Sequence, residues 1–139
     1  MKVMVLVKAT PATEAGQMPT EDEIRAMGAY NQQLVQAGIM LAGEGLHPTS
    51  RARRVRFGTP AVQVIDGPFA DTGDLACGFW LWQVRSLEEA TEWLTRAPFG
   101  PGDVVELRPI LGPEDFGEAF TPELQAQEQR LRDQLDTTH

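Results

Sequence analysis

Apolar and polar positions follow two different periods along the chain, and each change of period marks an expected element. Lys2–Lys8 is a mostly apolar, valine-rich run, which is typical of a buried central strand. Residues 78–84 form a strongly apolar, aromatic strand. Residues 103–110 alternate cleanly between apolar and polar and predict the last core strand.

Two segments have the helical period, and each begins with a capping box. Thr20 is followed three residues later by Glu23, and Ser86 by Glu89. Gly38 stands where a left-handed residue would end the first helix. The apolar residues expected on one face of this first helix are Ile24, Met27, Leu34 and Val35, with Tyr30 beside them.

The remaining segments of the body predict a loop, a strand and a hairpin. Residues 9–19 are rich in Pro, Gly and Thr and read as loop. Residues 39–46 form a short strand that contains two glycines. Because these positions lack side chains, another backbone segment or a ligand can approach closely there. Residues 53–57 and 61–66 form a hairpin around a turn at 58–60.

The resulting order is β-α-β, a hairpin, then β-α-β. It predicts an α+β, ferredoxin-like fold in which two helices cover one face of a mainly antiparallel sheet. The other face needs cover as well, and a homodimer that packs sheet on sheet would supply it. The residues expected to make this open face apolar are Phe79, Leu81, Val104 and Leu107.

The chain changes character after Gly112, so we expect a domain at residues 1–112 and an acidic extension at residues 113–139. Pro122 follows Thr121 as the first residue of an expected helix. Its one narrow apolar stripe consists of Leu124, Leu131 and Leu135. The stripe either docks on the body, docks across the dimer, recognises another protein, or frays in solution.

Charge and composition exclude several classes of protein. The net charge of −8 argues against a nucleic-acid partner, and no apolar run is long enough to cross a membrane. The single cysteine, Cys77, fits a reducing cytoplasm. Four arginines lie at 51, 53, 54 and 56, where strand geometry divides them between two faces; they would pair with the acidic tail or anchor an anionic ligand.

No cofactor or metal is predicted. The two histidines lie far apart and have no cysteine or histidine partner at metal-ligand spacing. No glycine-rich phosphate loop precedes a helix, so nucleotide binding has no support.

Several segments together resemble the DGPF branch of the YCII-related proteins. They are the "DGPFAD" turn, the "GFWLWQV" strand, "SLEEATEWLTRAPF" and "VELRPI". The resemblance implies a dimeric α/β barrel of ferredoxin-like subunits, with a cleft near the dimer interface. Many relatives are encoded beside, or fused to, extracytoplasmic-function sigma factors. A few members of the wider superfamily are small-molecule enzymes, including one type that eliminates chloride from an aromatic ring.

The wider YCII group has a histidine in the first helix and an aspartate before a proline after the second helix. A His–carboxylate pair of this kind suits general acid–base work. In this chain the two places are taken by Tyr30 and Ala97, so the pair cannot be carried over.

The catalytic candidates are therefore Asp66, His47, Glu44 and Tyr30. Asp66 either accepts backbone hydrogen bonds within the Asp-Gly-Pro turn or places its carboxylate in the cleft. His47 is either a solvated loop residue or the base of a proton transfer, and Glu44 either faces solvent or enters the cleft. Tyr30 either fills the core with its hydroxyl at the rim or supplies that hydroxyl to a ligand.

The candidates for ligand contact are Phe69, Trp80 and Arg108. Phe69 is either a plug over the core or a stacking ring, and Arg108 pairs with a carboxylate or clamps a ligand. Two functions follow: a small-molecule enzyme or binding protein with a cleft near the dimer interface, or a non-catalytic module that binds a sigma factor through the acidic tail.

Overall fold

The computed structural model describes residues 1–70 and 73–138. The chain divides into two compact units, Met1–Pro109 and Ile110–His139. Each unit is described by itself.

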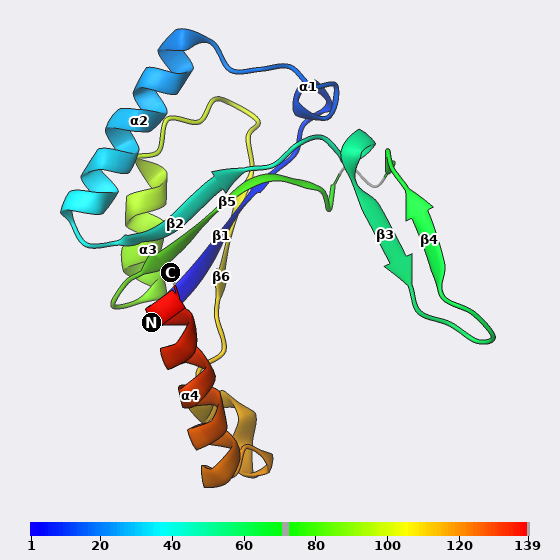
Figure 1. Ribbon diagram of the computed structural model, residues 1–139. Helices are drawn as coiled ribbons and strands as arrows, with labels where there is room; N and C mark the ends of the chain where they lie inside the picture. The colour runs from blue at the N-terminus through cyan, green and yellow to red at the C-terminus, as the bar shows by residue number, and fades with distance from the viewer. Residues whose placement is uncertain (71–72, 139) are drawn as a thin grey trace. The chain divides into compact units, whose positions relative to one another are not determined.

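The first unit contains a four-stranded sheet in the order β2-β5-β1-β6, in which each neighbouring pair is antiparallel (Figure 1). The strands are β1 (Lys2–Lys8), β2 (Met40–Gly45), β5 (Ala76–Gln83) and β6 (Val105–Pro109). Helices α2 (Glu21–Gln36) and α3 (Leu87–Thr95) connect β1 to β2 and β5 to β6. This order confirms the predicted α+β, ferredoxin-like fold.

Both helices pack against the same face of the sheet. That face carries Val3 and Val5 from β1, and Trp80 and Trp82 from β5. The largest fully buried side chains are Trp82, Leu34, Val3 and Val5. Glycine is required at position 43, because a Cβ there would lie 2.6 Å from Cδ1 of Trp80. Gly43 of β2 thus makes room for a core indole.

The capping predictions are confirmed. The Thr20 hydroxyl accepts a hydrogen bond from the Glu23 amide at 3.2 Å, and the Ser86 hydroxyl accepts one from Glu89 at 3.1 Å. Gly38 has the expected positive φ of 72°.

The predicted apolar face of α2 was wrong at its margins. Tyr30 and Leu34 are buried and Met27 is half-buried, whereas Ile24 and Val35 are exposed. Residues 27, 30 and 34 form the line that meets the sheet, whereas 24 and 35 both lie on one flank of that line. The segment predicted as loop also contains a short helix, α1 (Pro11–Glu14), capped by Thr10.

The predicted hairpin is present as β3 (Arg53–Arg56) and β4 (Gln63–Asp66), which pair only with each other (Figure 1). A short 3-10 turn, η1 (Thr49–Arg51), precedes it. The hairpin is therefore a separate two-stranded sheet within the first unit, joined at its base to the rest of that unit.

The second unit consists of the 3-10 segment η2 (Pro113–Ala119) and helix α4 (Pro122–Thr138). The rings of Phe116 and Phe120 pack 5.4 Å apart, and the Thr121 hydroxyl accepts a hydrogen bond from the Leu124 amide. Among the described residues, no helix combines the length and the apolar character needed to span a bilayer.

Candidate functional site

The face of the sheet that points away from α2 and α3 carries an ordered set of side chains. Strand register places one row across the strands β2, β5, β1 and β6: Glu44, Phe79, Leu6 and Glu106. The next row is Ala42, Leu81, Met4 and Arg108. This open face therefore has an apolar centre with charged groups on both edge strands.

A charged cluster occupies the β6 edge of the open face. The carboxylate of Glu106 lies 3.4 Å from the Lys8 ammonium and forms a second ion pair with the Arg108 guanidinium. Desolvation alone would raise the pKa of Glu106, but Arg108 and Lys8 outweigh it, so the pKa lies below its usual value. Glu106 is thus held as a carboxylate, and sequence reasoning missed its place in the cluster.

The predicted composition of the open face needs one correction. Phe79 and Leu81 lie on it, as expected. Leu107 does not, because it is opposite Val5 and packs against the core under the helices. Val104 precedes β6 and is exposed. Successive residues of a strand point to opposite faces of the sheet. Glu106 and Arg108 lie on the open face, so Leu107, which stands between them, points to the core.

Two predicted site residues lie on the opposite, helix-covered face. The Tyr30 hydroxyl donates a 2.6 Å hydrogen bond to the carbonyl of Trp93, and burial raises the pKa of Tyr30 to about 12, with Arg96 opposing the shift. The indole of Trp80 donates to the Asn31 side chain at 2.9 Å. Both aromatic residues are below 6% exposed, so the sheet separates them from Glu44 and Arg108.

The DGPF corner lies at the base of the hairpin. Asp66 is exposed and pairs with Arg53 at 3.2 Å. The amide of Gly67 donates to the carbonyl of Ala52, and the φ of Gly67 is not positive. Asp71, the last residue of the motif, lies outside the described residues.

A latch that sequence reasoning missed holds this corner. The Glu14 carboxylate accepts two hydrogen bonds from Thr49, one from its amide at 3.0 Å and one from its hydroxyl at 2.6 Å. The same hydroxyl accepts a 3.0 Å bond from the amide of Phe69, whose ring lies under the guanidinium of Arg54 at 3.8 Å. No spacing in the sequence signals this contact, because the three segments are far apart along the chain.

His47 lies in the exposed loop after β2. Its ring nitrogens are 3.1 and 3.4 Å from Nη1 of Arg51.

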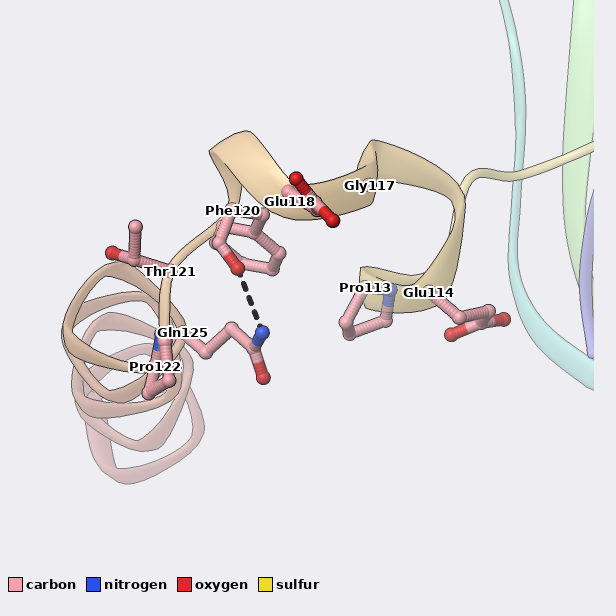
Figure 2. Close-up of a pocket in the computed structure, with 8 residues that line it drawn as sticks. All are labelled: Pro113, Glu114, Gly117, Glu118, Phe120, Thr121, Pro122 and Gln125. Carbon is pink, nitrogen blue, oxygen red and sulfur yellow. Dashed lines mark hydrogen bonds between the residues drawn. The ribbon is translucent and has the colours of Figure 1, made fainter.

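Two shallow hollows on the described part of the chain are lined by none of the predicted site residues. One, in the first unit, is lined by Ala37, Ile39, Gln83, Val84, Arg85, Glu89, Glu92, Trp93 and Arg96. The other lies in the second unit between η2 and the start of α4, where the Gln125 side chain reaches back to the carbonyl of Phe120 (Figure 2). Within residues 1–70 and 73–138, no group of His, Cys, Asp and Glu side chains has the arrangement of a metal site.

Comparison with known proteins places the chain in a family. The model of the YCII-related domain matches residues 1–114. A Rhizobium meliloti protein described as uncharacterized is 35% identical over 95 residues, which cover 65% of this chain and 76% of that protein.

The fold was also compared with solved structures. One similar structure is 5-chloro-2-hydroxyhydroquinone dehydrochlorinase from Burkholderia phenoliruptrix, in complex with 2,5-dihydroxybenzoquinone. It is 20% identical, with a TM-score of 0.40, over 83% of this chain and 99% of that chain. On the family match, this chain belongs to the YCII-related family.

Proposed function

We propose that the chain binds a small aromatic carboxylic acid on the open face of its sheet, in a cleft that closes when a second copy packs over that face. The supporting observation is the row Glu44, Phe79, Leu6 and Glu106, with Lys8 and Arg108 beside its last member. An apolar centre between polar edges is the usual character of a small-molecule site.

The dimensions of the row fit one ring with a substituent at each end. Neighbouring strands lie about 4.8 Å apart, so the backbones of Glu44 and Glu106 are separated by about 14 Å. The side chains shorten that span to roughly the length of a substituted benzene. The ring would lie on Phe79 and Leu6, where aromatic contact adds to the burial of apolar surface.

The charged ends give the site its polarity. Arg108 is two-thirds exposed, so its guanidinium can take a ligand carboxylate in addition to Glu106. Glu44, at the other edge, can accept a hydrogen bond from a ligand hydroxyl. For a chemical step, Glu44 is the carboxylate placed to take that proton.

Binding of 4-hydroxybenzoate, measured by isothermal titration calorimetry, tests the proposal. We expect Arg108→Gln to weaken binding about tenfold or more, because it removes a charge-assisted hydrogen bond worth about 1.5–3 kcal/mol. The neutral probe 4-hydroxybenzyl alcohol should bind weakly and respond little to this substitution. Arg25→Gln, which alters an exposed arginine of α2, is the control. Equal affinities for the Arg108→Gln and Arg25→Gln variants would contradict the proposal.

The alternative function is a non-catalytic module that binds an extracytoplasmic-function sigma factor through α4. One observation favours a protein contact at this helix: Leu124, Leu131 and Leu135 are all exposed. Truncation after Gly112 tests the alternative in a pull-down with such a sigma factor, and unchanged capture by the truncated chain would exclude α4 as the contact.

A further inference from the structure

The β3–β4 hairpin has one apolar face, and that face is exposed. Val55 is directly opposite Val64, so the two side chains project from the same side. Phe57 and Val62 follow at the same alternation just beyond the strand ends. All four side chains are more than half exposed, and Phe57 is 81% exposed. They form a continuous apolar surface, the hairpin face.

This hairpin needs a covering partner. Its strands pair only with each other, and a two-stranded hairpin without a covered face is marginally stable in water. The latch at Glu14, Thr49 and Phe69 holds only its base. The hairpin face, farther along the strands, is left for another surface.

Helix α4 carries the matching surface. Leu124, Leu131 and Leu135 are spaced by seven and four residues, which places them on one side of the helix. The three leucines are between 45% and 59% exposed. A helix with a single narrow apolar stripe packs that stripe against another element, because it cannot bury the stripe itself.

The two segments that carry these surfaces have opposite net charge. Residues 51–66 contain four arginines and one aspartate, whereas residues 113–139 contain seven acidic residues and two arginines. The open face of the sheet also has an apolar centre, but its edges carry charges of both signs. Charge complementarity therefore favours the hairpin as the place where the stripe of α4 docks.

The strand register favours a contact between two chains. The hairpin follows β2, whose last residue Gly45 is opposite Gly78, which in turn is opposite Val7. The chain leaves the sheet toward α4 after Pro109, which is opposite Val3. The two exits are thus at opposite ends of β1. A two-fold axis that sets two sheets antiparallel brings the tail exit of one chain to the hairpin of the other, twice per dimer.

We propose that α4 of one chain packs its leucine stripe against the hairpin face of a second copy of the same chain. The contact is independent of any ligand on the open face, and it would hold the two copies together while covering both exposed apolar surfaces. Arg53, which projects from the same side of the hairpin as Val55, would then lie beside the acidic residues of the partner's tail.

Disulfide trapping tests the contact. Cys77 is first replaced by Ala, since it is the only cysteine. One tagged chain carries Phe57→Cys and a differently tagged chain carries Leu131→Cys, and the two are co-expressed and mildly oxidised. We expect a disulfide-linked heterodimer that carries both tags. The matched control replaces the Phe57→Cys chain with a Met18→Cys chain, whose cysteine is equally exposed but lies before α2, and should give less than about one tenth of the product.

Two outcomes overturn the proposal. A disulfide that forms within one chain of the Phe57→Cys/Leu131→Cys double variant, with none between chains, would show that α4 folds back on its own hairpin. A heterodimer yield no higher than that of the Met18→Cys control would show that α4 and the hairpin do not meet.

Discussion

Gly67 and Thr49 approach so closely that a Cβ on Gly67 would lie 1.7 Å from the carbonyl oxygen of Thr49. The glycine of the DGPF motif is therefore needed for space between two backbone segments, and its φ is not positive. Together with the bond from the Gly67 amide to Ala52, this contact makes the motif the joint between the hairpin and the rest of the first unit.

Replacing Gly67 by alanine should destabilise the protein by about 3 kcal/mol, because the atoms that the new methyl meets are backbone and cannot rotate away. Chemical denaturation measures this change. Gly28→Ala is the control: nothing lies near a Cβ there, the residue is inside α2, and the substitution should stabilise by up to about 1 kcal/mol. Similar unfolding free energies for both variants would show that the corner is loose.

The Thr49 hydroxyl should be the central group of the latch. Thr49→Val removes the hydrogen bond from the Thr49 hydroxyl to Glu14 and the acceptor of the Phe69 amide. We expect the free energy of unfolding to fall by about 1–3 kcal/mol. Hydrogen exchange at the Phe69 amide should become faster in this variant. Thr91→Val, at an exposed site on α3, should leave that amide unchanged. Unaltered exchange at Phe69 in Thr49→Val would show that the latch does not hold the corner.

The ion pair between Asp66 and Arg53 should contribute little to stability. Both side chains are mostly exposed, and solvent screens such pairs, so Asp66→Asn should change the unfolding free energy by less than about 1 kcal/mol. The same variant tests whether Asp66 has the ligand role that the sequence allowed. Unchanged affinity for 4-hydroxybenzoate would leave Asp66 with a surface pairing role only.

Tyr30 should titrate well above the usual range for tyrosine. It is the only tyrosine, so its ionisation can be followed by absorbance. Burial raises its pKa to about 12 in the folded chain, against about 10 unfolded. The neutral form is favoured by folding, so stability should fall as the pH rises from 10 to 12. Tyr30→Phe should lack this part of the pH dependence. An apparent pKa near 10 in the folded protein would contradict the buried position.

Much of the fold could be predicted from the sequence, because it depends on local signals. Thr20 and Ser86 begin helices through contacts three residues away, and the apolar run of β1 needs no knowledge of its neighbours. The errors arose where a position depends on distant partners. Ile24 and Val35 fit the helical period but lie on one flank of the face that meets the sheet, where they are exposed.

The candidate site likewise combines residues that local signals could predict with contacts that depend on distant partners. Glu44 was proposed from the glycines on either side of it and Arg108 from its place in the last strand before Pro109, both of which are local signals. Alternation along a strand tells which residues share a face. It cannot tell that Tyr30 and Trp80 point the other way, because that requires the register between β5 and the helices above it. The cluster around Glu106 required the pairing of β1 with β6, which brings Lys8 beside it.

The most direct test of the central claim is the location of a bound aromatic acid. Two-dimensional ¹H–¹⁵N NMR spectra of the protein, recorded while 4-hydroxybenzoate is added, report which backbone amides respond. The account predicts the largest shifts at Leu6, Phe79 and Glu106, on the open face. Shifts concentrated instead around Trp93 and Arg96, or around Glu118 and Gln125, would place the ligand in one of the two hollows and contradict the account.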